Sequence, residues 1–404
     1  MLLSRRRMLM RLTFYICIIL FFYQLYEKIP VGKQEKISLS EILKNERCKK
    51  RTCVKCPLRP TTVPSFRVNA AITILCRNED LEGIKRSLDS FDRNINENLN
   101  YPYIFINNVN FSETFKNGVQ NHLLMLREKS LNIPIVEYSL IDEKDWGYPE
   151  FIDKKKAENV RKSFKSRFIS YGRLESYSGP FFMNKDLLKY DYYWRVEPDV
   201  DFYCKIDYDP FSLMKEKKFK YGFNMMVKEE MGTIPTLFKT TMDFLKFNNI
   251  KPKSLFKMFM VKKNFFLRLF SKEKFYYNGH HFWSNFEIGD FKFFRSKPYQ
   301  DYFNYLDKSG GFFYERWGDA PVHSLAVGAF LDKNEVHHFS DIGYRHDIAE
   351  NCPIFPPGKD CGLKCNCVQR PNWMLPFGKG IYSSYWNKIY TWYDFVDEEE
   401  ELHY

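Results

Sequence analysis

The chain has 404 residues, of which 44% are hydrophobic and 18% aromatic, so it contains enough apolar material for a large folded domain and is not broadly disordered. Its formal net charge is +12 at pH 7. Such a charge suits nucleic acid, anionic membranes or acidic substrates. The basic residues are spread along the chain without a nucleic-acid-binding motif, so we expect no nucleic-acid partner. A phosphate-bearing substrate and a solvated, lysine-rich surface both remain compatible with the charge.

The N-terminus predicts a membrane anchor. Four arginines precede or enter a short apolar run from Leu12 to Tyr23. A spanning helix needs about 20 residues, but a thin early-secretory bilayer would accept a shorter one. Because no small-residue cleavage site follows, we favour an uncleaved signal anchor over a cleaved signal peptide, with a cytoplasmic N-terminus. We expect a cytoplasmic tail over 1–11, a transmembrane segment over 12–26, a lumenal stem over 27–66 and a folded domain over 67–404.

The cysteines also indicate a lumenal domain. One of the ten lies in the predicted anchor, and most of the others form two clusters, namely Cys48, Cys53 and Cys56, and Cys352, Cys361, Cys365 and Cys367. In an oxidising compartment such clusters indicate disulfides. Zinc is the alternative, but the CxxC pair has no second pair at zinc-finger spacing. Nine lumenal cysteines leave at least one free or paired between chains. Asn110 begins an Asn-Phe-Ser glycosylation acceptor.

Strand and helix signals alternate after the stem. Ala70–Cys76 is a short apolar run with β-branched members, which predicts a buried strand, and the acidic residues after it predict a helix that continues to Arg93. Further strands are expected at Tyr101–Asn108, Ile133–Ile141 and Asp191–Val196. The alternation predicts an α/β fold with a largely parallel sheet. Ligands bind such sheets beyond the carboxyl ends of the strands.

The second half of the chain is less regular. Lys220–Val227 predicts another strand, and Ile234–Phe247 predicts an amphipathic helix. The segment Ile250–Tyr277 is dense in Lys, Phe and Leu, and we expect a surface helix that packs its aromatic face, in preference to a membrane contact. The acidic run Asp397–Glu401 is expected to be a solvated tail.

The aromatic stretch Tyr192–Phe211 contains five carboxylates, which are Glu197, Asp199, Asp201, Asp207 and Asp209. Pro198 lacks a backbone donor and ends the strand, so Glu197 and Asp199 project at its end. An acid-x-acid pair after a buried strand suits a divalent cation, although the bare pattern is common. A turn cap is the alternative for Asp199, and local turn structure is preferred for Asp207 and Asp209. Asp201 has no assigned role.

Several long segments, in the expected order between about Val68 and Tyr393, resemble the fungal Golgi α-1,2-mannosyltransferases of glycosyltransferase family 15. They are AAITILCRNEDL, DWGYPEFIDKKKA, RVEPDVDFYCKIDYDPF, TIPTLFKTTMDF, HHFWSNFEIGD, GGFFYERWGDAPVHSLA and DIGYRH. The resemblance implies a GT-A-like nucleotide-sugar-binding domain over 67–404, with a mixed, largely parallel sheet flanked by helices. It also implies GDP-mannose as donor, Mn²⁺ as cofactor, and a single-pass type II protein of the Golgi membrane with a lumenal catalytic domain.

The resemblance also implies roles for particular residues. Glu197 and His346 are the expected metal ligands, although a lone histidine is more often structural. Glu287 is expected near the anomeric carbon of the sugar, either as the nucleophile of a double displacement or as the group that stabilises charge in a same-face attack, and both routes retain configuration. Asp319, close to His323, is expected to accept the acceptor's proton or bind a sugar hydroxyl, with turn structure as the alternative.

Donor and acceptor contacts complete the expected site. Arg77, after the first strand, is our candidate for a nucleotide contact because arginine pairs well with phosphate; a surface ion pair is the alternative. Tyr171 and Arg173 match family positions near the donor phosphate, whereas Ser176 and Pro180 depart from the family pattern there. Trp283 is expected to stack on a sugar, with core packing as the alternative, and Asp199 belongs to the same binding set. Trp317 and Tyr314 are further stacking candidates.

We therefore expect a retaining α-1,2-mannosyltransferase that transfers mannose from GDP-mannose to mannosyl acceptors on glycoproteins, N- or O-linked, or on glycolipids. One alternative is a catalytically inactive lumenal glycan-binding protein on the same fold; the joint presence of Glu197, Glu287 and His346 argues against it. The other alternative is a glycoside hydrolase that uses two of the same acids, which would need no metal-bound diphosphate.

Overall fold

The structure is a computed structural model that describes residues 58–60, 67–130, 132–142, 146–167, 181–262, 274–347, 349–353 and 364–367. The predicted cytoplasmic tail, anchor and acidic C-terminal run, and almost all of the predicted stem, lie outside these residues. Within the described ranges, no helix combines the length and apolar character needed to span a bilayer.

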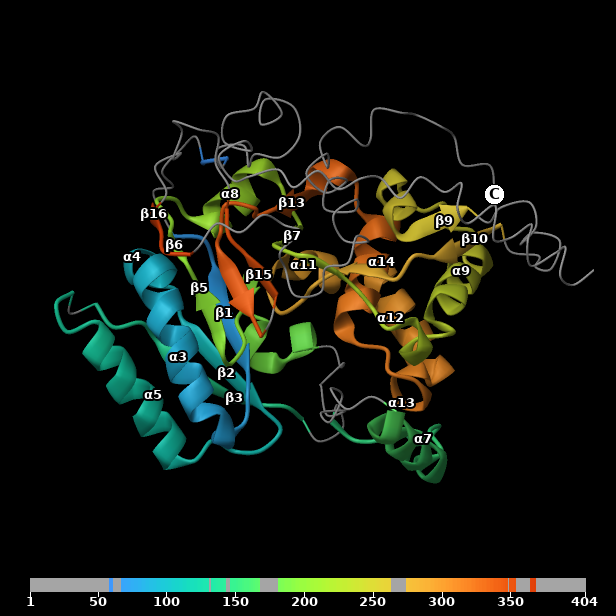
Figure 1. The fold of residues 1–404 in the computed structure, drawn as a ribbon, viewed down its shortest axis with the longest axis horizontal. Coiled ribbons are helices and arrows are strands. Elements are labelled where there is room, and N and C mark those ends of the chain that lie inside the picture. Colours follow the sequence, from blue (N-terminus) through green and yellow to red (C-terminus); the bar gives the residue numbers. More distant parts are fainter. Residues whose placement is uncertain are drawn as a thin grey trace, which may run out of the picture. The chain divides into compact units, whose positions relative to one another are not determined.

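A seven-stranded sheet carries the domain, in the order β13-β7-β12-β4-β1-β2-β3 (Figure 1). Parallel pairing joins β1 to β2 and β4, β2 to β3, and β7 to β13, whereas β12 is antiparallel to β4 and β7. The sheet is therefore mixed and largely parallel, as predicted. Its strands are β1 (Ala70–Leu75), β2 (Tyr103–Asn107), β3 (Val136–Leu140), β4 (Tyr192–Arg195), β7 (Tyr221–Phe223), β12 (Glu287–Asp290) and β13 (Val336–His338).

Helices flank this sheet. Figure 1 shows α3 and α5 beside β1–β3, and α9, α12 and α14 grouped at the other end of the sheet. The α-helices are α3 (Leu81–Phe91), α4 (Glu97–Leu99), α5 (Glu113–Leu126), α7 (Lys154–Arg167), α8 (Pro210–Lys217), α9 (Leu237–Phe247), α11 (Phe291–Phe294), α12 (Lys297–Ser309), α13 (Gly311–Tyr314) and α14 (Asp319–Phe330). Shorter helical segments are η2 (Asn78–Asp80), η3 (Asp92–Asn96), η5 (Phe181–Met183), η6 (Lys185–Leu187), η7 (Met231–Thr233), η8 (Ser254–Phe259) and η9 (Lys333–Glu335).

The two ends of the sheet are covered by helices of different character. The apolar residues of α3 lie on one face, and Ile84, Leu88 and Phe91 of that face are buried, as expected for an amphipathic surface helix. In contrast, every residue of α14 from Ala320 to Ala329 is buried. A helix that is buried all round belongs to the interior, so α14 is an internal element of the domain.

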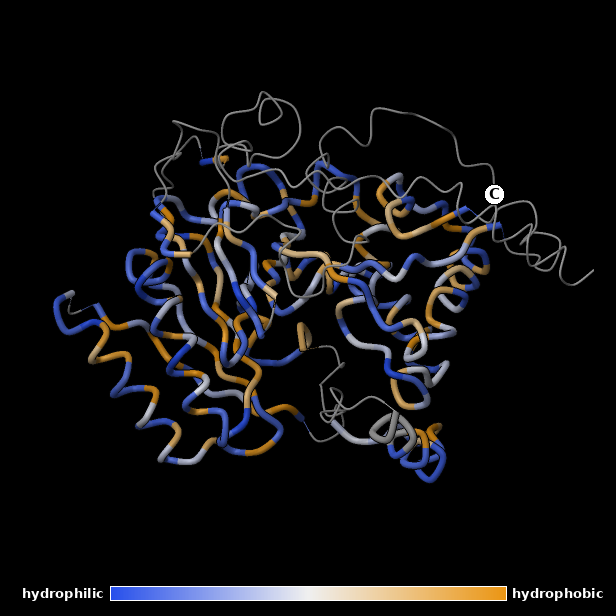
Figure 2. Tube along the Cα trace, in the orientation of Figure 1, coloured by the Kyte–Doolittle hydropathy of each residue, from blue (hydrophilic) through white to orange (hydrophobic). Residues whose placement is uncertain are grey.

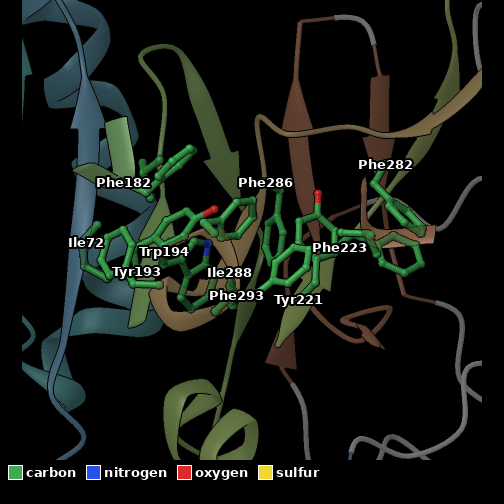
Figure 3. Packing of buried hydrophobic residues seen from close by; sticks show 14 of the residues in the cluster. Ile72, Phe182, Tyr193, Trp194, Tyr221, Phe223, Phe282, Phe286, Ile288 and Phe293 are labelled. Atoms are coloured by element: carbon green, nitrogen blue, oxygen red, sulfur yellow. The ribbon is translucent and has the colours of Figure 1, made fainter. Parts of the chain in front are cut away.

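Aromatic side chains fill the space between the sheet and its helices. Trp194 packs edge-to-face on Phe91 and Phe286, with ring centroids 5.1 and 5.3 Å apart. Figure 3 shows Tyr193 and Trp194 of β4 and Tyr221 and Phe223 of β7, two strands that β12 separates in the sheet, and Figure 2 shows hydrophobic residues along β1 and β2. Because side chains alternate along a strand, Tyr193 lies on the opposite face of β4 from Trp194.

In the part of the chain that the structure describes, four small sheets accompany the central one. They are β5 (Val200–Phe202) with β14 (Tyr344–His346) and β15 (Ala349–Asn351), β6 (Cys204–Lys205) with β16 (Lys364–Cys365), β8 (Met226–Lys228) with β11 (His280–Phe282), and β9 (Met260–Lys262) with β10 (Phe275–Tyr277). Disulfides join Cys204 to Cys365 and Cys352 to Cys367. Cys76 is buried with a free thiol. The predicted disulfide chemistry is thus present in the described residues, and Cys204 is a partner that the clusters did not indicate.

Two sequence expectations were wrong. The segment Ile250–Tyr277 does not form one surface helix: its described residues form η8, β9 and β10, and Phe256 and Phe259 are buried. The expected strand Lys220–Val227 divides into β7 and β8, which join different sheets. Asn224 explains the division, because its amide donates to the carbonyls of Phe339 (2.7 Å) and Ile342 (2.8 Å) and the chain leaves the central ladder there.

A buried ion pair ties the end of α5 to η3. Arg127 donates to both oxygens of Asp92, at 2.5 and 2.8 Å, and both side chains are buried. The remaining donors of Arg127 reach the carbonyls of Asn96, Glu97 and Asn132. A buried charge is stable only when its partners are complete, and here the guanidinium group is surrounded by acceptors.

Replacing Arg127 with alanine should destabilise the domain by about 3–5 kcal/mol, because it leaves the buried Asp92 carboxylate without its cation. Urea unfolding followed by intrinsic fluorescence measures this difference. Arg93→Ala is the matched control: Arg93 contacts Asp89 at 3.4 Å on the exposed surface, and its loss should cost less than about 1 kcal/mol. Equal effects of the two substitutions would contradict the prediction.

Candidate active site

The carboxylates of the Tyr192–Phe211 stretch have separate partners. Asp207 pairs with Arg59 at 2.8 Å. Asp209 caps α8 by accepting from the backbone N–H of Phe211 at 3.0 Å, and it also accepts from Tyr101 Oη at 2.7 Å. Asp209 therefore has the local role that was expected, whereas Asp207 forms an ion pair with a residue 148 positions away in the chain.

Asp201, which had no assigned role, accepts from Arg345 Nε at 2.6 Å. The two residues are register partners in the antiparallel pair β5 and β14, so their ion pair lies across that pairing. It helps to hold β14 beside β5. This matters because the next residue of β14 is His346.

Glu197 and His346 come together through the chain reversal after β4. Asp199, which is exposed, has a positive φ of 60° and its backbone N–H donates to the carbonyl of Gly83 at 3.0 Å. The chain then enters β5, in which Val200 is the register partner of His346. As a result, His346 Nε2 lies 3.9 Å from Glu197 Oε2.

The chemistry of this pair fits a divalent cation of the manganese type. Carboxylate oxygen and neutral imidazole nitrogen are both ligands of first-row divalent metals. Among the described residues, no group of three or more His, Cys, Asp or Glu side chains is placed to hold a metal. The pair therefore offers a partial ligand set, which suits a cation that also binds the phosphates of a substrate.

Arg195 organises the acids around this pair. Its Nη2 donates to Glu197 Oε1 at 2.5 Å, and its Nη1 donates to Asp319 Oδ2. Asp319 is the first residue of α14. Burial acts to raise the pKa of Asp319, but the charges of Arg195 and His323, with hydrogen bonds from Arg195 and Ser284, outweigh it and lower the pKa to about 2.

Glu287 lies at the first position of β12, as the register partner of Arg195. Its side chain is fully buried. Tyr193 donates to Oε1, Tyr221 donates to Oε2 at 2.8 Å, and His323 Nδ1 lies 2.9 Å from Oε2. Burial and the nearby Glu287 charge raise the pKa of both tyrosines well above its usual value, so they remain protonated donors. The carboxyl group is thus held on both oxygens.

The turn between β11 and β12 closes the site. The ring of Trp283 meets the ring of His346 edge-to-face, with centroids 5.1 Å apart. Asn285 Nδ2 lies 3.2 Å from Glu197 Oε2 and 3.3 Å from His346 Nδ1. This turn therefore contacts both candidate metal ligands.

The other expected contacts fall in different places. Arg77 follows the carboxyl end of β1, and its guanidinium lies 3.7 Å from Glu79. Tyr171 and Arg173 lie outside the described residues, as do Ser176 and Pro180. Trp317 is buried in the core, which favours the packing alternative for that residue.

Sequence reasoning missed Arg195, Asn285 and the two tyrosines that hold Glu287. One signal was available, because Tyr193, Arg195 and Glu197 alternate with apolar residues and alternation places them on one face of a strand. No comparable local pattern pointed to Tyr221 or Asn285.

An α/β fold with an acid and a histidine at the end of β4, and a buried carboxyl group on the adjacent strand β12, is the arrangement expected of a glycosyltransferase. The family model described as glycolipid 2-alpha-mannosyltransferase matches residues 26–381. The chain belongs to this family, glycosyltransferase family 15, and the resemblance noted in the sequence is confirmed.

Curated relatives share about two fifths of their residues with this chain. The O-glycoside alpha-1,2-mannosyltransferase omh1 of Schizosaccharomyces pombe is 39% identical over 318 residues, which cover 76% of each chain. The alpha-1,2 mannosyltransferase KTR1 of Saccharomyces cerevisiae is 40% identical over 309 residues, which cover 74% of each chain.

Solved structures are similar over most of the chain. The mannosyltransferase Ktr4p of S. cerevisiae in complex with GDP is 33% identical with a TM-score of 0.71, and the match covers 92% of this chain and 95% of Ktr4p. Core-mannan synthase A (CmsA/Ktr4) of Aspergillus fumigatus, in its Mn/GDP form, is 34% identical with a TM-score of 0.66, over 80% of this chain and 83% of that one.

The low pKa of Asp319 predicts a pH-dependent contribution to stability. A lowering from 3.8 to about 2 corresponds to about 2 kcal/mol, present above pH 4 and lost as the pH falls toward 2. Asp319→Asn should therefore destabilise the protein at pH 7, and its difference from wild type should shrink to about half at pH 3. Urea unfolding of both proteins at pH 7, 5 and 3 measures this. A difference that stays constant with pH would contradict the prediction.

Proposed function

We propose that this chain is a retaining α-1,2-mannosyltransferase that transfers mannose from GDP-mannose to mannosyl acceptors on glycoproteins, N- or O-linked, or on glycolipids. The observation that carries the proposal is the meeting of Glu197 Oε2 and His346 Nε2, 3.9 Å apart, at the end of β4. Membership of the family, and relatives named as O-glycoside and glycolipid mannosyltransferases, support the reaction class. The related structures in GDP and Mn/GDP form support the donor and the cofactor.

Glu197 and His346 are the residues that would hold Mn²⁺, which neutralises the diphosphate and stabilises it as a leaving group. Arg195 occupies Oε1 of Glu197 and leaves Oε2 directed to His346. Arg77, at the end of β1, is proposed to contact the nucleotide. Asp199 follows the end of β4, and Trp283 packs against His346. Both are proposed to contact donor or acceptor, as are Tyr171 and Arg173 on sequence grounds.

Asp319 is proposed to bind a sugar hydroxyl. A carboxylate whose pKa is about 2 is a weak base, and a general base works best when its pKa is near the working pH. Its ion pair with Arg195 also holds the carboxylate in one orientation. A weakly basic carboxylate in a fixed orientation can accept a hydrogen bond from a sugar hydroxyl, but it is poorly suited to removing the proton of that hydroxyl.

Glu287 is proposed to act in a same-face reaction. A double displacement requires a carboxylate oxygen free to bond to the anomeric carbon, and both oxygens of Glu287 are engaged within a buried site. In the same-face route, the acceptor oxygen bonds to the anomeric carbon as the bond to the GDP phosphate breaks. The acceptor proton passes to the departing phosphate oxygen. Glu287 stabilises the positive charge that develops on the sugar while the bond to the phosphate breaks.

The proposed location is the Golgi membrane, with a single-pass type II topology. The predicted tail 1–11, anchor 12–26 and stem 27–66 would precede a lumenal catalytic domain over 67–404. The disulfides Cys204–Cys365 and Cys352–Cys367 support an oxidising compartment. Asn110 of the glycosylation acceptor is exposed, which is also compatible with a lumenal domain.

The proposal is tested by incubating the purified protein with GDP-mannose, Mn²⁺ and a panel of mannosides, followed by linkage analysis of the product. We expect α-1,2-linked mannose, no product with a chelator, and a loss of activity of about 100-fold or more in Glu197→Ala. Glu113→Ala is the matched control, because Glu113 pairs with Lys116 at the exposed surface of α5, at 2.8 Å. Full activity of Glu197→Ala at low Mn²⁺ would refute the metal assignment.

Glu287→Gln should lower kcat by about 100-fold or more, because it removes the negative charge that the transition state requires. The KM for GDP-mannose should change little, since the hydrogen-bond partners of Glu287 are Tyr193, Tyr221 and His323 and not the candidate metal ligands Glu197 and His346. Steady-state kinetics measure both constants. A kcat within twofold of wild type would exclude a catalytic role. A mannosyl adduct on Glu287, detected by mass spectrometry of the wild-type enzyme during turnover, would instead establish the double displacement.

A further inference from the structure

Asn285 occupies a central position between the two candidate metal ligands. Its Nδ2 lies 3.2 Å from Glu197 Oε2, and 3.3 and 3.4 Å from the two ring nitrogens of His346. The backbone holds the residue there from both sides. The carbonyl of Asn285 accepts from Tyr344 Oη at 3.2 Å, and the N–H of Trp283 donates to the carbonyl of Met225 at 2.9 Å.

We propose that the Asn285 carboxamide is the third protein group of the cation site, and that it binds the cation through Oδ1. The inference rests on the proposed function, because it assumes that Glu197 and His346 hold Mn²⁺. It adds a neutral oxygen ligand from the β11–β12 turn to the carboxylate and imidazole that the strand end and β14 supply.

Without a cation, the amide group of Asn285 contacts both Glu197 and His346 and holds them close together. Arg195 already binds Glu197 Oε1, so Oε2 is the oxygen that remains for a second donor, and Asn285 Nδ2 provides one. A carboxamide NH₂ carries two hydrogens and can serve two acceptors. Donation to an imidazole nitrogen requires that nitrogen to be unprotonated, which is the form of histidine that binds metals.

When a cation binds to Glu197 and His346, the NH₂ group faces it unfavourably, because both amide hydrogens carry partial positive charge. Rotation about the terminal torsion of Asn exchanges Nδ2 and Oδ1 in nearly the same space. The rotated amide presents a carbonyl oxygen, which is a ligand that hard divalent cations accept. The same side chain therefore fits both the empty and the loaded site.

A neutral ligand is also appropriate for the charge of this site. Glu197 and Asp319 already supply two carboxylates around one guanidinium group. A third carboxylate would oppose the approach of a nucleotide diphosphate, whereas an amide oxygen binds the metal without adding negative charge.

The test is a titration of the full-length, detergent-solubilised protein with Mn²⁺ alone, in which electron paramagnetic resonance measures the free ion. Asn285→Leu keeps the approximate volume but removes oxygen and donors, and its Kd for Mn²⁺ should rise by about tenfold or more. Asn285→Asp keeps an oxygen at the same position and should bind Mn²⁺ at least as tightly as wild type. Glu197→Ala is the reference variant and should lose binding.

Binding by Asn285→Leu within twofold of wild type, when Glu197→Ala has lost it, would overturn the inference and leave the proposed function intact. The inference would also be overturned if Asn285→Asp bound Mn²⁺ as weakly as Asn285→Leu. The N–H donors of Asn285, and not its oxygen, would then be the group on which Mn²⁺ affinity depends. Unchanged binding in Glu197→Ala would remove the cation site itself. Thermal unfolding without Mn²⁺ checks each variant's fold. Should Asn285→Leu fail to fold, Asn285→Asp decides alone: weaker binding than wild type overturns the inference.

Discussion

The guanidinium group of Arg195 lies between two carboxylates, and the arrangement of the site depends on it. Glu197 and Asp319 come from a strand end and from the start of a helix, and without a cation between them they would repel each other. Arg195 binds one oxygen of each. Because its geometry is planar and fixed, it orients both acids and leaves Glu197 Oε2 available for His346. Ion pairs this sheltered are costly to assemble and costly to break, which suits a group that positions others.

The helix α14 extends this arrangement to the buried carboxyl group. Asp319 and His323 are four residues apart, so they lie on one face of the helix. Asp319 contacts Arg195 of β4, and His323 contacts Glu287 of β12. Arg195 and Glu287 are themselves cross-strand partners. Two adjacent strands and one internal helix therefore hold the four side chains, and sites built on such rigid elements are more precise than sites built on loops.

Much of the first half of the sheet was predictable from the sequence. The strands β1 to β4 lie within the expected segments, and β1 and β2 show why, because a buried strand of a parallel sheet is a largely continuous apolar run. The second half was not, for reasons that concern particular residues. Asn224 separates β7 from β8 by bonding to distant carbonyls. Phe256 and Phe259 are buried in the core, and Phe259 packs against α14. The aromatic residues of this segment therefore serve tertiary packing and do not mark an amphipathic helix.

The family, the α/β class, the acid at the end of β4 and the cysteine chemistry of the domain could all be inferred from the amino-acid sequence. Each of these features can be recognised from short stretches of sequence, namely the apolar runs, the proline at position 198 and the family motifs in their expected order along the chain. Only contacts between distant segments establish that His346 meets Glu197, that Arg195 bridges to Asp319, that Cys204 pairs with Cys365, and that Asn285 lies between the two candidate metal ligands. Each of these contacts joins segments far apart in the chain through pairing such as β5 with β14, and the periodicity of one segment carries no information about its partner.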